Sequence, residues 1–140
     1  FTGSLICNDI SPIGEVCENT IVLNVGPEVL TGSTRLKSGT ATKMVLNMIS
    51  TISMRDAGKI YKNYMVDVKM TNEKLRARGA GIVKAITGAE DGVIQNALEQ
   101  SGQQVKTAIV MIEQDVNADT ARDLLEKAGG HIDRIERKDC

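Results

Sequence analysis

The stretch SLICNDISPIGEVCENTIVLNV, residues 4–25, decides the fold class of the N-terminal part of the chain. Its first segment, Ser4–Cys7, is a short apolar run that ends at turn-forming residues, which predicts a buried strand. Ser11 and Pro12 are typical of a helix start, and Thr20–Val25 is rich in β-branched residues and predicts a second strand. A strand, a short helix and a strand joined by tight links predict two parallel neighbours.

Two strands are too few to make a stable sheet. We therefore expect them to be the edge of a larger parallel sheet whose other strands lie outside this chain, which begins at Phe1 rather than Met. Further along, apolar residues between Ala41 and Met54 recur at the spacing of one helix face, and others lie outside that face. This pattern predicts a long, largely buried helix over residues 41–54.

The remaining part of the chain has the pattern of short helices joined by short loops. After a connector over residues 58–67, four helical segments follow, and a last turn is expected near Ile132. The four segments end at Gly88, Gly102, Asp115 and Gly129. We predict an α/β protein with mostly helical content, divided into residues 1–70 and a compact helical module over residues 71–140.

Composition excludes several function classes. No apolar run approaches the roughly 20 residues that span a bilayer, which argues against a membrane protein. The formal net charge is −1 and aromatic residues make up 2% of the chain, so charge-driven nucleic-acid binding and base stacking are not expected. Cys7, Cys17 and Cys140 match no metal or redox spacing and are expected to be reduced thiols, while the single His131 follows a helix-stop signal.

The loop between the second strand and the long helix carries the side chains that could bind a ligand or take part in a reaction. In an open parallel sheet, ligands bind beyond the carboxyl ends of strands and near helix N-termini. Residues 25–40 offer five hydroxyls, the cations Arg35 and Lys37 and the carboxylate of Glu28, which suit a phosphate or sugar hydroxyls. A purely structural role is equally open from the pattern, because Ser33 or Thr34 can cap the helix and Glu28 can face its positive end.

Several runs of the chain resemble one enzyme family. GPEVLTGSTRLKSGTA (residues 26–41) closely resembles the signature of the N-acetylmuramic acid 6-phosphate etherases. Further matching runs, in chain order, are LNMIST (46–51), NYMVDV (63–68), TNEKL (71–75), KTAIVM (106–111) and EKAGGHI (126–132). The glucokinase regulatory proteins share the Gly-Ser-Thr-Arg part of the signature and less of the remainder.

This resemblance implies that residues 1–70 are the C-terminal part of a SIS domain, a parallel α/β sandwich, and that residues 71–140 form a helical module resembling a ubiquitin-associated domain. The family cleaves the D-lactyl ether of N-acetylmuramic acid 6-phosphate, giving N-acetylglucosamine 6-phosphate and D-lactate. It works as a cytoplasmic homodimer without a metal or organic cofactor. The family's catalytic acid and base lie upstream of this chain, so no catalytic residue is assigned and the chain alone is expected to be inactive.

The same resemblance suggests ligand-binding candidates in the loop. Glu28 is expected to bind sugar hydroxyls, and Ser33, Thr34 and Lys37 are expected to lie near the sugar phosphate or in the scaffold of the loop. Arg35 is expected to brace the pocket. The alternatives are a sugar-phosphate-binding regulatory protein resembling the glucokinase regulatory proteins, and a pure interaction module. Release of D-lactate would separate the enzyme from the sensor.

Overall fold

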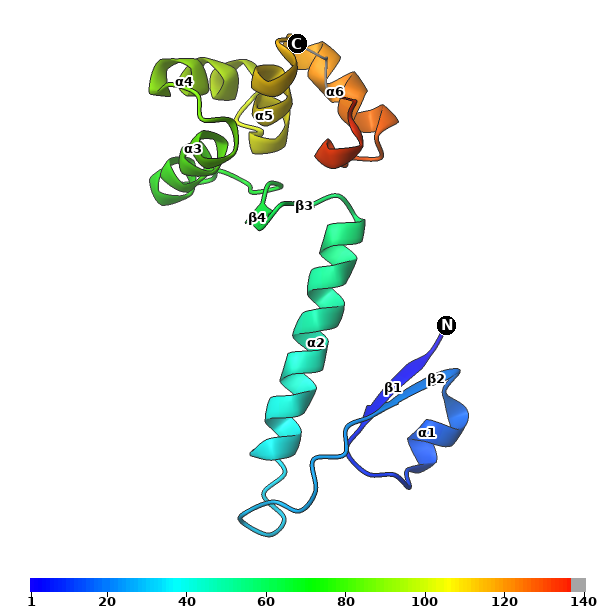
Figure 1. Ribbon diagram of the computed structural model, residues 1–140. Helices are drawn as coiled ribbons and strands as arrows, with labels where there is room; N and C mark the ends of the chain where they lie inside the picture. Colours follow the sequence, from blue (N-terminus) through cyan, green and yellow to red (C-terminus); the bar gives the residue numbers. More distant parts are fainter. Residues whose placement is uncertain (137–140) are drawn as a thin grey trace. The chain divides into compact units, whose positions relative to one another are not determined.

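The computed structural model describes residues 1–136, and Cys140 therefore lies outside the described residues. The structure is mostly helical, as predicted, with six α-helices and two small sheets in the described part (Figure 1). It divides into two compact units, residues 1–52 and 53–140. Among residues 1–136, no helix combines the length and the apolar composition that crossing a bilayer requires.

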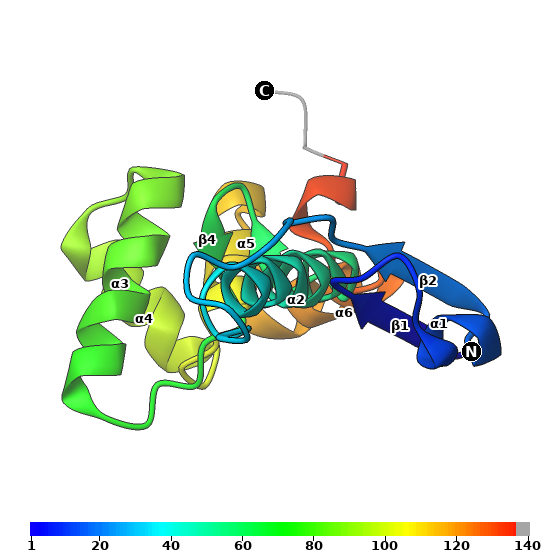
Figure 2. The ribbon, with the colours of Figure 1, turned by 90° about the horizontal axis from the view of Figure 1, so that it is seen from below.

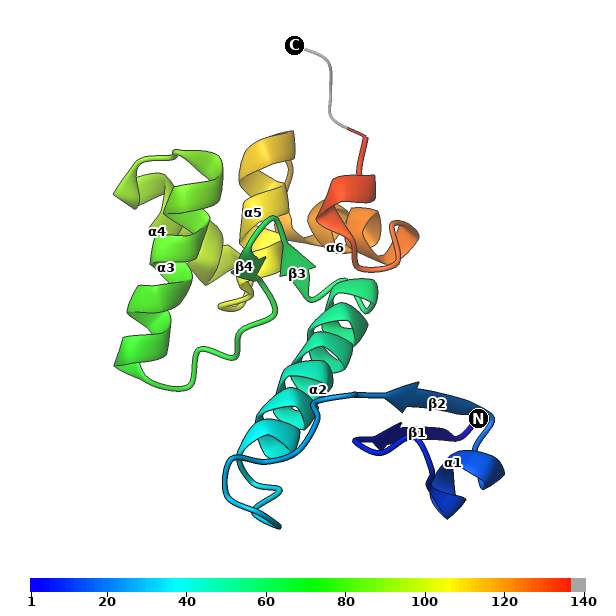
Figure 3. The ribbon, with the colours of Figure 1, turned by 60° about the horizontal axis from the view of Figure 1, so that its bottom comes forward.

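The first unit opens with the predicted strand, helix and strand. β1 (Gly3–Ile6) and β2 (Asn19–Val22) pair in parallel with Ser4 opposite Thr20, and α1 (Pro12–Val16) connects them, as Figure 3 shows. The hydroxyls of Ser4 and Thr20 lie 2.8 Å apart across the two strands. The Thr20 hydroxyl also donates to the carbonyl of Gly14 in α1, at 3.1 Å, so one side chain ties the helix to the sheet.

α2 (Lys37–Asp56) begins four residues before its predicted start and contains no buried residue. The predicted burial of this helix is wrong: Met44, Met48 and Ile52 are 52%, 55% and 55% exposed. The spacing of the apolar residues places them on one side of the helix. That side is buried only where another layer of structure packs against it. Within the first unit, the Sγ atom of Cys7 reaches only the first turns of α2, 3.7 Å from the Thr42 hydroxyl.

The second unit begins with a hairpin that the sequence pattern did not predict. β3 (Ile60–Tyr61) and β4 (Tyr64–Met65) pair antiparallel within the expected connector. The turn between them is two residues long, and Lys62 adopts a positive φ of 55° at its first position. Asn or Gly is the usual signal for such a conformation, and Lys62 is neither.

The four predicted helices of the second unit are all present. They are α3 (Glu73–Thr87), α4 (Asp91–Gln100), α5 (Val105–Gln114) and α6 (Ala118–Lys127), followed by the 3₁₀ turn η1 (Ile132–Arg134). α5 is the central helix, because α3, α4 and α6 all pack against it (Figure 2). Ala108 and Ile109 on α5 are completely buried, as expected for a helix that is apolar on most of its surface.

The core of the second unit extends to residues that precede the helices. Tyr61, Val66 and Met70 are buried in the same cluster as the helical residues. The last turn of α2 also joins this unit, where His131 Nε2 lies 3.1 Å from the carbonyl oxygen of Asp56. Gly58 approaches so closely here that a Cβ atom on it would lie 2.6 Å from the carbonyl oxygen of Gly130.

Candidate functional site

The loop with the predicted ligand-binding residues connects β2 to α2. The backbone N–H of Leu23 donates to the carbonyl of Ile6 at 2.7 Å, which extends the pairing of the two strands beyond β2. The Cys7 thiol, just after β1, lies 3.9 Å from the carbonyl oxygen of Ser38. These contacts bring the carboxyl end of β1 next to the start of α2, the position where parallel α/β sheets bind ligands.

The Glu28 carboxylate receives hydrogen bonds from the start of α2. Its Oε1 accepts from the backbone N–H groups of Lys37 (3.1 Å) and Ser38 (3.0 Å), and its Oε2 accepts from the N–H of Lys37 (2.9 Å). A helix start has unpaired N–H groups and a positive end, and a carboxylate satisfies both. The backbone N–H groups of Ser38 and Lys37, in that order, lower the pKa of the Glu28 carboxyl, which keeps it ionised.

Ser33 and Thr34 lie in a folded turn upstream of α2. The Ser33 N–H donates to the carbonyl of Leu30 at 3.0 Å, and the carbonyl of Thr34 accepts from the N–H of Gly39 at 2.8 Å. The backbone of both residues is therefore fixed by hydrogen bonds. Within residues 1–136 neither side-chain hydroxyl has a hydrogen-bond partner, and neither caps α2. Both hydroxyls are available to a ligand.

The two cations of the loop differ in their placement. The Lys37 ammonium extends back over the loop, where a Cβ atom on Gly26 would lie 3.8 Å from its Nζ. Its charge makes a small contribution to the lowered pKa of Glu28. Arg35 is exposed, and the described part of the chain gives it no salt bridge. The structure therefore brings Glu28 and Lys37 together and leaves the predicted bracing role of Arg35 as a prediction.

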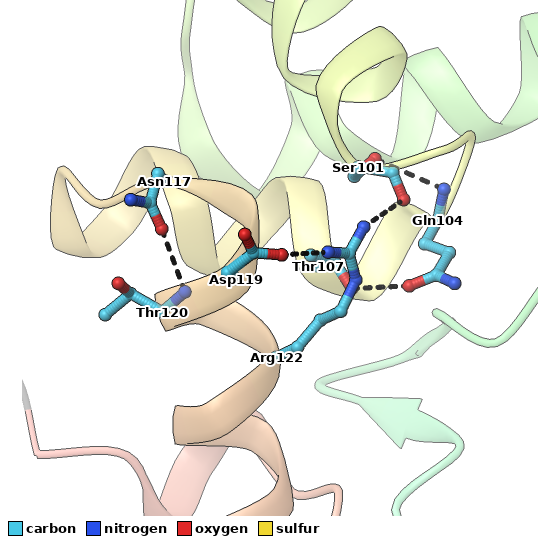
Figure 4. Close-up of polar contacts among 7 residues, drawn as sticks. All are labelled: Ser101, Gln104, Thr107, Asn117, Asp119, Thr120 and Arg122. Atoms are coloured by element: carbon cyan, nitrogen blue, oxygen red, sulfur yellow. Dashed lines mark hydrogen bonds and ion pairs between the residues drawn. The ribbon is translucent and has the colours of Figure 1, made fainter.

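A cavity of about 820 Å³ lies in the second unit and was missed by the sequence analysis. Its wall comes from three segments: residues 66–71, residues 102–107, and α6 with the two glycines that follow it. Figure 4 shows the polar contacts of Arg122, which lines the cavity: its guanidinium donates to the Asp119 carboxylate (2.7 Å) and to the carbonyl of Ser101 (3.3 Å). No local pattern signals a cavity whose wall is assembled from separate segments.

Metal-binding groups are not assembled in the described part of the chain. Residues 1–136 contain no cluster of three or more His, Cys, Asp or Glu side chains placed to hold a metal ion. Cys7 and Cys17, two of the predicted reduced thiols, are free. The loop over residues 25–40 itself offers hydroxyls, one carboxylate and two cations.

Comparison with known proteins bears on the predicted family. Residues 62–123 match the C-terminal lid domain of glucokinase regulatory protein. An N-acetylmuramic acid 6-phosphate etherase of Bacillus licheniformis is 48% identical over 94% of this chain and 43% of its own length. The corresponding Streptomyces coelicolor protein is 51% identical over 94% of the chain and 42% of its length. The predicted resemblance to the N-acetylmuramic acid 6-phosphate etherases is confirmed.

The etherase relatives are more than twice as long as the matched segment. The Bacillus subtilis etherase, for example, is 45% identical over 95% of this chain but over only 44% of its own length. The chain thus spans less than half the length of these relatives, and it matches their C-terminal part. The similarity covers the loop of the first unit and the helices of the second together.

Proposed function

We propose that the protein to which this segment belongs is a lyase that cleaves the D-lactyl ether of N-acetylmuramic acid 6-phosphate. The products are N-acetylglucosamine 6-phosphate and D-lactate. The observation that carries this proposal is the 45–51% identity to etherases across about 94% of the chain. Identity at this level over nearly the whole chain covers both structural units rather than one short motif.

The proposed reaction removes the proton at C2 of the sugar, expels lactate from C3, and then adds water across the resulting double bond. It requires a base at C2 and an acid at the ether oxygen. The loop over residues 26–37 holds one carboxylate, Glu28, whose oxygens are hydrogen-bonded to α2. We propose that the acid and the base come from outside this chain, and no catalytic residue is assigned here.

The segment's proposed role is to bind the sugar phosphate. The unpartnered hydroxyls of Ser33 and Thr34 can donate to phosphate oxygens, and the Lys37 ammonium supplies a positive charge at the same loop. For Glu28 to bind a sugar hydroxyl as well, that hydroxyl must use the lone-pair direction of Oε2 that the helix leaves open. Arg35 is proposed to support the pocket from its exposed position.

The finer architecture is also a proposal. We infer that residues 1–70 complete a SIS domain and that residues 71–140 form a module resembling a ubiquitin-associated domain. The pair of parallel strands and the exposed apolar side of α2 support the first assignment, since both need further structure to pack against. We further propose a cytoplasmic homodimer that needs no metal or organic cofactor.

One observation favours a second function. The match of residues 62–123 to the lid domain of glucokinase regulatory protein supports a regulatory protein that binds a sugar phosphate without cleaving it. In that case the loop would hold the ligand in the same way, and the absence of a reaction would distinguish the two functions. The etherase relatives, which match over a longer part of the chain, favour the lyase.

The experiment uses the full-length protein with N-acetylmuramic acid 6-phosphate and follows D-lactate enzymatically. The lyase releases D-lactate. The double variant Ser33→Ala/Thr34→Ala is expected to lower kcat/KM by about a hundredfold or more, because it removes two hydrogen bonds to a charged group at about 1.5–3 kcal/mol each. Thr120→Ala, at an exposed position of α6, is the control and should leave kcat/KM unchanged. Binding of the sugar phosphate without D-lactate release would support the regulatory protein instead.

A further inference from the structure

The arrangement of Glu28 suggests a role that differs from direct contact with the sugar. We propose that Glu28 is a positioning residue: by bonding to the start of α2 it closes the loop of residues 29–36 and fixes the hydroxyls of Ser33 and Thr34 and the Lys37 ammonium around the substrate. The inference rests on the proposed sugar-phosphate site and deepens it, because it separates the groups that bind the ligand from the group that holds them.

The first support is the sequence distance that the contact spans. α2 has no acidic residue in its first turn. Glu28 supplies the carboxylate from nine residues upstream and accepts three hydrogen bonds from Lys37 and Ser38. The contact therefore ties the two ends of an eight-residue loop together, the geometry of compact loops whose ends lie close in space.

The second support lies inside the closed loop. Its backbone is held by bonds from the N–H of Ser33 to Leu30 and from the N–H of Leu36 to Ser33, at 3.0 and 3.1 Å. The N–H of Gly39, in the first turn of α2, donates to the carbonyl of Thr34 at 2.8 Å. These bonds and those of Glu28 together hold the backbone of residues 33 and 34 against the start of α2.

The third support is electrostatic. A helix N-terminus attracts anions, and a substrate phosphate would ordinarily be a candidate for this position. Here the ionised Glu28 already occupies it, and its negative charge would repel a phosphate at the same place. The phosphate is therefore assigned to the Ser33 and Thr34 hydroxyls and to the Lys37 ammonium rather than to the helix start.

The first arm of the test measures the loop itself and needs no substrate. In the full-length protein, Glu28→Ala is expected to speed amide hydrogen exchange at Lys37 and Ser38 by about fivefold or more, the typical effect of losing a helix cap. Glu28→Gln should also speed this exchange, because the Gln side-chain NH₂ is a hydrogen-bond donor and would face the N–H donors of Lys37 and Ser38. Glu15→Gln, an exposed residue of α1, is the matched control and should change nothing. Unchanged exchange in Glu28→Ala overturns the proposal.

The second arm asks whether Glu28 acts on the ligand directly. Affinity is measured as KM for compounds that the protein cleaves and as a competitive inhibition constant for those that it does not, with N-acetylmuramic acid 6-phosphate and analogues lacking the C1 or the C4 hydroxyl. A positioning residue weakens binding of all three compounds by the same factor, expected to be at least tenfold. If Glu28→Ala weakens binding of the natural substrate but not of one analogue, Glu28 binds that hydroxyl itself and the proposal is wrong.

The two proposals fail in different ways. If the wild-type protein does not bind the sugar phosphate at all, the proposed function is wrong, and the exchange rates at Lys37 and Ser38 still decide whether Glu28 closes the loop. If the wild-type protein binds the substrate and Glu28→Ala binds it equally well despite faster exchange, the function stands and the positioning role is refuted.

Discussion

Gly58 follows the last turn of α2 and lies close to the backbone of Gly130, and Gly58→Ala is expected to destabilise the second unit strongly. A Cβ atom there would lie 2.6 Å from the carbonyl oxygen of Gly130 and 2.8 Å from its carbonyl carbon. These are backbone atoms, which cannot rotate away as a flexible side chain would. Gly58 also has a φ of +67°, which is unfavourable for any residue with a Cβ atom.

The expected free-energy change follows from three contributions. The left-handed conformation costs about 1–2 kcal/mol for alanine. Forcing an extra carbon into a packed position costs a further ~1–3 kcal/mol. Alanine also restricts the unfolded chain, which offsets about 0.4–1 kcal/mol. The net loss of stability for Gly58→Ala is therefore about 2–4 kcal/mol.

Two other glycines separate these contributions. Gly88 has a φ of +69°, but a Cβ atom added to it would meet nothing within 4 Å, so Gly88→Ala should cost only about 1 kcal/mol. Gly81 lies in α3 with open space around it and no positive φ, so Gly81→Ala should stabilise the unit by roughly 0.5–1 kcal/mol.

Urea unfolding followed by tyrosine fluorescence measures all three variants. The two tyrosines of the chain, Tyr61 and Tyr64, both lie in the second unit, so their signal reports on that unit. The expected order of stability is Gly81→Ala above wild type, then Gly88→Ala, then Gly58→Ala. A Gly58→Ala variant as stable as Gly88→Ala would refute the close approach to Gly130.

Three further perturbations test the helices, the core and the loop. Asn72 and Asn117 cap α3 and α6 through bonds of 2.9 Å to backbone N–H groups, so changing each to Ala should cost about 1 kcal/mol in urea unfolding, additively. Ile109→Ala, at a completely buried position, should cost about 2–5 kcal/mol, whereas Val93→Ala on the surface should change stability by less than ~0.5 kcal/mol. Because the pKa of Glu28 is lowered, its carboxylate stabilises the folded protein at pH values above the ordinary carboxyl pKa, and this stabilisation is lost as the pH falls through the lowered pKa. The melting temperatures of wild type and Glu28→Gln should therefore converge at acidic pH.

Local signals in the sequence were sufficient for most elements of the fold. These signals are each contained within a few neighbouring residues: Ser11 with Pro12, the β-branched run at Thr20, and the glycines that end the helices. The structure places β1, α1, β2 and the helices α3–α6 where these signals predict them. The hairpin at Tyr61 escaped because its strands are two residues long and Lys62 is not a typical turn residue.

The features that the sequence did not reveal depend on contacts between distant residues. The apolar positions of α2 show which side of the helix avoids water but not whether a layer covers it. The bonds between Glu28 and the start of α2 join residues nine positions apart, although the pattern did allow this carboxylate to face the helix end. At the large cavity, Arg122 of α6 lies beside the loop that precedes α5, and no spacing of residues in the sequence predicts this contact.

The most direct test of the proposed lyase is its reaction in deuterium oxide. The full-length protein is incubated with N-acetylmuramic acid 6-phosphate, and the products are followed by NMR and mass spectrometry. We predict equal amounts of D-lactate and N-acetylglucosamine 6-phosphate, with one deuterium at C2, because the C2 proton is removed and replaced from solvent. Tight binding of the intact substrate without release of D-lactate would contradict it.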